Sequence, residues 1–422
     1  MHTPTTTSAA RPLAFYIRSV SSGLGAEKVV LNVAAGLAAR GHEVDLLIEE
    51  VDDDLPGRLP VGVNLIDLRK PARFPLVDLL FRVASLVVNL ARRARPDPCG
   101  NVSFRTALAR FLFKRRPPLH ALRHYLHARR PESVISFLNY PNIALLLAAQ
   151  LGKTDTRIYV NVRNHISSSV VGAKSRRMRE IPVLMRNLFP LADGIVAVSD
   201  GVADDIARLT GISANCMTTI FNPVYRPEVL DLAKAPPPHP WLRPGAAPVV
   251  LGVGKMKPQK DFATLLKAFG RLRKGRAARL IILGDGDGRP GLEALAEELG
   301  IRQDLDFPGY VDNPYVYYSH AAVFVLSSAW EGLPNVLIEA MACGCPVVST
   351  DCPSGPSEIL DGGRFGRLVP VGDDKAMAEA IAQTLDAARV PAAPAEHAQR
   401  FTFDRVTERY ERLLTRHAVA GR

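Results

Sequence analysis

Apolar residues along the first part of this chain recur as short unbroken runs that alternate with helical spacings. Leu13 to Ile17 is a short apolar run that fits a buried strand, and Val44 to Ile48 is another. Between them apolar residues recur at helical spacing from Glu27 to Arg40, and Gly41 follows as a C-terminal stop. Strand, helix and strand in this order predict the βαβ unit of a parallel, doubly wound sheet.

The same alternation continues through two halves of the chain. The first half contains further predicted strands with helical stretches between them, at Val134 to Phe137, Arg157 to Val162 and Gly194 to Val198. The second half repeats the rhythm with predicted strands at Val249 to Val253, Arg279 to Leu283, Leu305 to Phe307, Val323 to Leu326 and Pro346 to Ser349. Its predicted helices are Asp261 to Arg273, Arg289 to Leu299 and Pro334 to Ala342.

A proline-rich stretch separates the two halves, and 422 residues exceed one ordinary core. Six prolines between 226 and 247 are expected to prevent a regular helix or a central strand. We therefore expect an N-terminal domain (1–225), a linker (226–247), a C-terminal domain (248–400) and a final helix (401–422) that packs back on the first domain. The expected fold class is α/β, with two Rossmann-like doubly wound domains facing across a cleft at the carboxyl ends of their sheets.

Charge is distributed unevenly along the chain. The formal net charge of +11 lies entirely within residues 1–230, and residues 69–130 carry fifteen Lys or Arg against two Asp or Glu. We interpret 69–130 as a basic helical insertion whose field implies a polyanionic partner. From Phe104 to Arg116 the cations alternate with Leu and Phe, which is typical of an amphipathic helix on a membrane surface. The alternative is two ordinary helices with solvated outer faces.

Neither export nor a membrane span is indicated by the sequence. Met1 to Pro12 is polar and rich in threonine, without the apolar core of a signal peptide. No stretch reaches the roughly 20 uninterrupted apolar residues of a spanning helix. The five cysteines show no metal-ligand spacing, so free thiols in a reducing cytosol are expected.

The segment from Trp330 to Gly344 carries two carboxylates around a predicted helix start. A helix that begins at Pro334 offers free backbone N–H groups, which favour a bound phosphate. Glu331 precedes this start, and Glu339 lies within the helix. An ionised carboxylate accepts hydrogen bonds and can take two adjacent sugar hydroxyls. Spacing alone favours a surface Glu and a helix Glu that pairs with a nearby base.

Two loops that follow predicted strands are rich in glycine. Gly252 to Phe262 combines glycines with Lys255, Lys257 and Lys260, which supply positive charge for a diphosphate unless the loop is merely solvated. Ser22-Gly23-Leu24-Gly25 follows the first strand, but Lys28 stands where a dinucleotide fingerprint has its third glycine. A nicotinamide oxidoreductase is therefore not favoured.

The stretch Glu331-Gly-Leu-Pro-Asn-Val-Leu-Ile-Glu339-Ala-Met-Ala-Cys-Gly resembles the signature of family 4 retaining glycosyltransferases, also called glycosyltransferase group 1. This resemblance implies the GT-B fold. It further implies that Glu331 is catalytic and holds donor-sugar hydroxyls, while Glu339 holds the nucleotide ribose.

Other segments extend the resemblance. Lys255 and Lys260 match an Arg and a Lys that contact the diphosphate in the family, although a lysine at 255 offers a point charge in place of a bidentate fork. Gly284-Asp-Gly and the stretch around Gly309 resemble loops near the nucleotide and its base. The implied donor-binding residues are Gly23, Gly25, Lys255, Lys260, Gly284, Gly309, Gly332, Leu333, Asn335, Val336 and Glu339.

Two polar residues after the strand Arg157 to Val162 are candidates near the reacting sugar. The resemblance implies that Arg163 stabilises departing charge and that His165 orients the acceptor or the donor phosphate. A structural role is the alternative for each of them.

Together these residues imply a metal-independent, retaining transferase without a cofactor. Its expected substrates are a nucleotide-diphospho-sugar, with UDP-sugar favoured, and a saccharide or polyprenyl-linked lipid acceptor in cell-envelope or exopolysaccharide synthesis. The resemblance implies that the N-terminal domain (1–225) binds the acceptor and the C-terminal domain (248–400) binds the nucleotide-sugar. Residues 69–130 add an expected anionic membrane surface as partner, hence a cytoplasmic protein held peripherally at the inner face of the membrane. No nucleic acid is expected as a partner. The alternatives are a sugar-nucleotide epimerase of the same fold and a basic nucleic-acid-binding protein.

Overall fold

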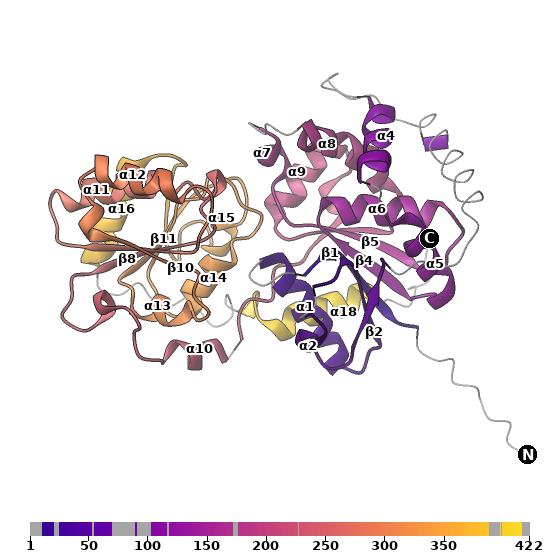
Figure 1. Cartoon of the computed structure of the whole chain (residues 1–422), viewed down its shortest axis with the longest axis horizontal. Coiled ribbons are helices and arrows are strands. Elements are labelled where there is room, and N and C mark those ends of the chain that lie inside the picture. Colours follow the sequence, from indigo (N-terminus) through magenta and orange to yellow (C-terminus); the bar gives the residue numbers. More distant parts are fainter. Residues whose placement is uncertain are drawn as a thin grey trace, which may run out of the picture. The chain divides into compact units, whose positions relative to one another are not determined.

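A computed structural model of the chain describes residues 11–20, 25–52, 55–69, 89–90, 103–115, 118–171, 176–226, 228–387, 397 and 399–415. The chain divides into two compact units, coloured indigo to magenta and mainly orange in Figure 1. The first domain comprises Met1–Val198, Val202–Pro223 and Val406–Arg422, and the second comprises Ser199–Gly201 and Val224–Arg405.

The first domain is built on a seven-stranded parallel sheet in the order β3-β2-β1-β4-β5-β6-β7. Its strands are β1 (Leu13–Ser19), β2 (Val44–Glu50), β3 (Val63–Asp67), β4 (Ser133–Phe137), β5 (Arg157–Val162), β6 (Gly194–Ala197) and β7 (Met217–Thr219). The described helices are α1 (Gly25–Ala39), α2 (Leu55–Arg58), α4 (Phe104–Arg115), α5 (Leu119–Arg129), α6 (Asn139–Gln150), α7 (Ile166–Val170), α8 (Arg176–Leu188), α9 (Asp200–Thr210) and α18 (Phe403–Leu414). The strand order reverses between β1 and β4, which makes the carboxyl ends of these strands a ligand-binding position.

The second domain repeats this plan with six parallel strands in the order β10-β9-β8-β11-β12-β13. These are β8 (Val249–Val253), β9 (Arg279–Leu283), β10 (Leu305–Gly309), β11 (Val323–Leu326), β12 (Val347–Thr350) and β13 (Arg367–Val369). The helices are α10 (Glu228–Ala233), α11 (Phe262–Arg273), α12 (Arg289–Glu298), α13 (Tyr315–His320), α14 (Asn335–Ala342), α15 (Pro356–Ile359) and α16 (Asp374–Asp386). Short 3-10 turns occupy Phe189–Leu191 and Ala214–Cys216 in the first domain, and Pro240–Leu242, Pro258–Lys260 and Arg302–Asp304 in the second. The prediction of two Rossmann-like parallel-sheet domains is confirmed.

The last described helix, α18, completes the core of the first domain. Val406, Tyr410 and Leu414 are fully buried against residues of β1, β2 and α1. The end of the helix is held by side chains of the sheet, because Ser133 Oγ and Arg157 Nη2 each donate to the Leu414 carbonyl at 2.6 Å. These bonds satisfy a carbonyl that a helix end otherwise leaves without a partner.

The proline-rich stretch is more ordered than its composition predicts. It contains the helix α10, because the segment 228–235 has no proline to interrupt it. Further along, His239 Nε2 lies 2.9 Å from Asp306 Oδ2, and the Arg279 guanidinium lies 4.9 Å from the centre of the Trp241 ring. The expectation that prolines exclude helix here is wrong, and the stretch packs on the second domain.

The basic insertion predicted for 69–130 lies partly outside the described residues, which lack 70–88, 91–102 and 116–117. Each of its two described helices buries an apolar face on the domain. The buried residues of α4 are Phe104, Ala107, Leu108 and Phe111, and those of α5 are Leu119, Leu122, Tyr125 and Leu126. Among the described residues, no helix has both the length and the apolar character needed to cross a membrane.

Candidate active site

Several loops of the second domain meet at the carboxyl ends of β8, β9 and β10. The backbone N–H of Gly254 donates to Leu283 O at 2.9 Å, and that of Gly284 donates to Gly309 O at 2.7 Å. Met256 N–H donates to Asp285 O at 2.9 Å, so the loop after β8 also lies on the loop after β9. Three of the sequence-predicted donor segments are therefore adjacent in space.

Gly284 is the residue that lets these loops approach one another. Its φ of +114° lies in the region that favours glycine, and an added Cβ would collide with the Gly254 carbonyl. Any other residue at 284 would push the loop after β8 away from the loop after β9.

Lys260 and Glu331 form a buried ion pair between the loops after β8 and β11. The Lys260 Nζ lies 2.6 Å from Glu331 Oε1, although the two residues are 71 positions apart in the chain. Ser328 Oγ donates to the same carboxylate oxygen at 2.7 Å, and Gln259 Nε2 donates to Oε2 at 3.4 Å. Glu331 is only 6% exposed. Its oxygens are thus fixed in position by three side chains.

The backbone around this pair is held by residues that the motifs did not indicate. Gln259 Nε2 donates to Trp330 O at 3.0 Å, and Ala329 N–H donates to Gln259 O at 2.8 Å. Ser354 Oγ donates to Glu331 O at 2.6 Å. The positions of Ser328 and Ser354 after the buried strands β11 and β12 are the only features of the sequence that indicate these hydrogen bonds.

The helix α14 begins one residue later than predicted. Pro334 has an extended ψ of 99° and therefore precedes the first turn, which starts at Asn335. The Pro334 ring also packs closely on Gly355, where an added Cβ would lie 2.6 Å from the proline Cδ. Pro334 makes no side-chain cap bond, and the Leu337 N–H donates to Pro334 O at 3.1 Å. The positive end of the helix dipole therefore lies beside Gly332, Leu333, Asn335 and Val336, where it favours an anion.

Glu339, in the middle of α14, is held by a tyrosine of α13. Tyr318 Oη donates to Glu339 Oε2 at 3.2 Å. Burial, and then the charge of Glu339, raise the pKa of Tyr318 and raise the pKa of Tyr315 to about 12. Both hydroxyls therefore keep their protons, so Tyr318 serves as a hydrogen-bond donor to the carboxylate.

The loop after β5 in the first domain places Arg163 in a buried position with a spare donor. Arg163 is 8% exposed, and its Nη2 donates to Asn222 Oδ1 at 2.8 Å. Its Nη1 has no hydrogen-bond partner within the described chain. Burial lowers the pKa of Arg163. A buried guanidinium with an unsatisfied N–H is suited to a ligand oxygen or anion.

His165, two residues further on, acts as the N-cap of α7. Its Nδ1 accepts from the Ser168 N–H at 3.3 Å, which places the proton of the neutral ring on Nε2. This Nε2 lies 3.6 Å from Asp205 Oδ1, and burial lowers the pKa of His165. The cap gives His165 a definite structural role. Of the two predicted glycines in the first domain, Gly23 lies outside the described residues and Gly25 is the exposed first residue of α1.

Comparison with known proteins identifies both halves of the chain. Residues 25–223 match the family described as "Glycosyl transferase 4-like domain", and residues 247–387 match "Glycosyl transferases group 1". The chain is 32% identical over 246 residues to the lipopolysaccharide core biosynthesis glycosyltransferase LpsE of Rhizobium meliloti, covering 57% of this chain and 69% of that protein.

A second relative is similar over nearly the whole chain. It is the N-acetylgalactosamine-N,N'-diacetylbacillosaminyl-diphospho-undecaprenol 4-alpha-N-acetylgalactosaminyltransferase of Campylobacter jejuni, 27% identical over 376 residues, with 89% of this chain and 90% of that protein covered.

Solved structures share the fold at lower identity. Sucrose-phosphate synthase from Thermosynechococcus elongatus superposes with a TM-score of 0.72 at 20% identity, covering 96% of this chain and 98% of that one. Anabaena HepE in complex with UDP gives 0.69 at 16% identity, with 96% and 99% covered.

Two parallel-sheet domains with these loops define a sugar-transferring enzyme of the GT-B class. Within that class the chain belongs to the group 1, or family 4, glycosyltransferases. The predicted family, fold and enzyme class are confirmed, and the comparisons support neither an epimerase nor a nucleic-acid-binding protein.

Proposed function

We propose that this glycosyltransferase transfers a sugar, with retention and without a metal ion, from a nucleotide-diphospho-sugar to a saccharide or lipid-linked acceptor in cell-envelope or exopolysaccharide synthesis. A UDP-sugar is the favoured donor. Relatives named for lipopolysaccharide core synthesis and for a diphospho-undecaprenol acceptor support the acceptor class. A structural relative in complex with UDP supports the nucleotide.

The Lys260–Glu331 pair is the observation that carries this proposal. An ammonium group has three donors, so Lys260 can keep Glu331 while it contacts a diphosphate oxygen. Glu331 then accepts from hydroxyls of the donor sugar, and Glu339 from the ribose. Lys255, which is exposed in the same loop, and the positive end of the α14 dipole stabilise the charge of the leaving diphosphate.

The proposed reaction breaks the bond between the anomeric carbon and the diphosphate oxygen. The acceptor oxygen forms its new bond on the same face of the sugar, and the departing phosphate oxygen takes the acceptor's proton. The products are a nucleoside diphosphate and the glycosylated acceptor. Arg163 is proposed to stabilise charge near the reacting sugar, whereas the capping bond makes His165 a positioning residue.

Replacement of Glu331 tests the donor site. Glu331→Gln keeps the side-chain size and the Ser328 bond but removes the charge, so kcat should fall by about 10²–10³. The assay follows transfer from a panel of UDP-, GDP- and ADP-sugars to a lipid-linked acceptor, in EDTA and in magnesium. NMR of the product anomer tests retention.

Glu293→Gln, which changes a carboxylate on α12 of the same domain, is the matched control and should leave kcat unchanged. Wild-type turnover by Glu331→Gln would remove Glu331 from the site. Activity that EDTA abolishes and magnesium restores would contradict metal independence.

We also propose that residues 69–130 hold the enzyme on the anionic inner face of the cytoplasmic membrane. The support is their fifteen cations against two acids, together with Phe113, which is 80% exposed beside the exposed Lys114. Sedimentation with vesicles should show binding that requires anionic lipid and weakens with salt. Equal binding to neutral vesicles would contradict the electrostatic form of this proposal.

A further inference from the structure

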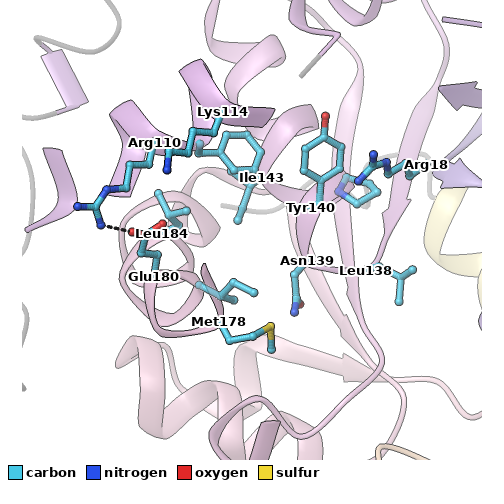
Figure 2. Close-up of a pocket in the computed structure, with 13 residues that line it drawn as sticks. Arg18, Arg110, Lys114, Leu138, Asn139, Tyr140, Ile143, Met178, Glu180 and Leu184 are labelled. Carbon is cyan, nitrogen blue, oxygen red and sulfur yellow. Dashed lines mark hydrogen bonds and ion pairs between the residues drawn. The ribbon is translucent and has the colours of Figure 1, made fainter. Parts of the chain in front are cut away.

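A pocket of about 630 Å³ opens in the first domain, and none of the residues that line it is among those predicted to bind the donor (Figure 2). Arg18 reaches it from the carboxyl end of β1, and Leu138, Asn139 and Tyr140 reach it from the loop after β4. The strand order of the sheet reverses between these two strands. The pocket thus occupies the position where doubly wound sheets bind ligands.

The walls of the pocket are mainly hydrocarbon. They come from α4, α6 and α8, which contribute Phe111, Ile143, Met178 and Leu184 among others. The rings of Phe111 and Tyr140 lie 5.3 Å apart and form one continuous apolar surface. Walls of this kind gain most from an apolar ligand, because each buried methylene contributes about 0.8 kcal/mol.

Three of the six polar side chains that line the pocket are cations. Arg18, Arg110 and Lys114 line it, and Glu180 is the only carboxylate among the lining residues. Figure 2 shows that Glu180 forms an ion pair with Arg110, whose Nη1 lies 2.5 Å from Glu180 Oε1. Lys114 is exposed and has no ion pair within the described part of the chain. Arg18 is likewise paired, because its Nη2 lies 2.6 Å from Glu50 Oε1, so Lys114 is the lining cation that favours an anionic group on the ligand.

One wall of the pocket is held in position by side-chain contacts before any ligand binds. Tyr140 Oη donates to Glu49 Oε2 at 3.0 Å, Tyr16 donates to the other oxygen of Glu49, and the Arg18 guanidinium lies 5.3 Å from the centre of the Tyr140 ring. Leu138 has a φ of +75°, which is strained for a residue with a side chain. Rigid walls and a strained backbone position are typical of a preorganised site.

We propose that this pocket binds the first isoprenoid units and the phosphate of a prenyl-phosphate-linked acceptor. The apolar walls take the chain, and Lys114 takes the phosphate. The inference rests on the proposed lipid-linked acceptor and assigns it a binding site in the first domain.

Farnesyl diphosphate is a soluble probe for both parts of this ligand. Isothermal titration calorimetry on the full chain should detect its binding, with farnesol and inorganic diphosphate each binding at least tenfold more weakly. Equal binding of inorganic diphosphate would show an anion site without a chain site and would overturn the proposal.

Two substitutions with matched controls locate the probe. Met178→Trp fills the pocket and should weaken binding at least tenfold, whereas Met178→Leu keeps the volume and should not. Lys114→Ala should also weaken binding about tenfold, whereas Arg105→Ala, which removes an exposed cation of the same helix that does not line the pocket, should have little effect. Unchanged binding by both Met178→Trp and Lys114→Ala would refute the assignment.

Transfer assays separate failure of the pocket from failure of the proposed function. Met178→Trp should raise KM for a long-chain acceptor at least tenfold more than it raises KM for a chain-free acceptor analogue. Farnesyl diphosphate binding without transfer to any acceptor would keep the pocket and reject the function. If the rate of transfer does not depend on the acceptor's chain length in wild type or variant, the proposed function stands and the proposed role of the pocket is contradicted. Vesicle binding altered by Met178→Trp would point to bulk phospholipid and contradict the acceptor assignment.

Discussion

The Lys260–Glu331 pair places two opposite charges where water has little access. The two side chains are 18% and 8% exposed, so each loses much of its hydration on folding. The Ser328 hydroxyl and the Gln259 amide offset part of this loss by satisfying further lone pairs of the carboxylate. The pair is therefore stable only as a unit, and removal of one partner leaves the other charge buried alone.

Lys260→Met should destabilise the second domain by about 3 kcal/mol, because Glu331 stays buried without its cation. The double variant Lys260→Met with Glu331→Gln should recover much of this stability but no activity, since the charge conflict disappears with the site. Denaturant unfolding of the single and double variants measures the coupling. Additive effects of the two changes would contradict a strongly coupled pair.

His165 should make the stability of the first domain depend on pH. Burial lowers its pKa in the folded protein below the value of about 6.5 expected when unfolded. The folded state then binds fewer protons, so stability is present above pH 6.5 and is lost as pH falls toward the folded pKa. His165→Asn retains a capping side chain and should flatten this part of a plot of Tm against pH. Parallel curves for wild type and variant would contradict this.

At the scale of elements, α18 is the helix on which the first domain most depends. One face inserts Val406, Tyr410 and Leu414 into the core, and the other carries Glu411, which lies 2.7 Å from His42 Nε2. The helix, yellow in Figure 1, thereby packs on α1 and the sheet of the first domain.

Substitutions at Tyr410 and Arg412 should show how much each side of α18 contributes to the free energy of unfolding of the first domain. Tyr410→Phe loses the bond from Asn161 Nδ2, 3.0 Å long, and should cost about 1 kcal/mol. Tyr410→Ala leaves a cavity in the core and should cost about 4 kcal/mol. Arg412→Ala, on the exposed side of the same helix, should stay within about 0.5 kcal/mol of wild type. Denaturant unfolding checks the order, and an equal loss for all three would contradict it.

Strands were predictable where both faces of the sheet are covered. Val249–Val253, Arg279–Leu283 and Val323–Leu326 have the predicted bounds, because buried parallel strands are continuous apolar runs. The edge strands β7 and β13 were missed, since they have three residues each and are only partly buried. Helix α10 was missed because the surrounding prolines dominate the composition.

The candidate site was predictable only as separate segments. Motifs named Glu331 and Lys260 but not their contact, which depends on loops 71 residues apart meeting at one end of a sheet. Gln259 and Ser354 bind the backbone of this site and have no motif of their own. The pocket near Tyr140 was not predicted, because its walls come from three helices that share no sequence pattern.

At the scale of the whole molecule, the chain has two separate hydrophobic cores. Leu37 belongs to the core of the first domain and Leu265 to that of the second. A protein with two such cores does not unfold as a single two-state system. Ligands that contact one domain should therefore stabilise one transition more than the other.

Differential scanning calorimetry should show that UDP raises the transition of the second domain. Binding at 100 times Kd contributes about 2.7 kcal/mol to the state that binds. Leu265→Ala and Leu37→Ala each lower one transition and so identify it. Lys255→Ala should reduce the UDP shift without lowering the transition itself. A shift confined to the transition that Leu37→Ala lowers would place UDP in the first domain.

The return of α18 to the first domain has a consequence for how the protein is made. Domains commonly fold in the order in which they leave the ribosome. Here the second domain lies almost entirely within Val224–Arg405, whereas the first needs Val406, Tyr410 and Leu414 to close its core. The domain synthesised first is thus the last to be completed. Until translation passes Leu414, the apolar residues of β1, β2 and α1 that α18 buries lack this cover.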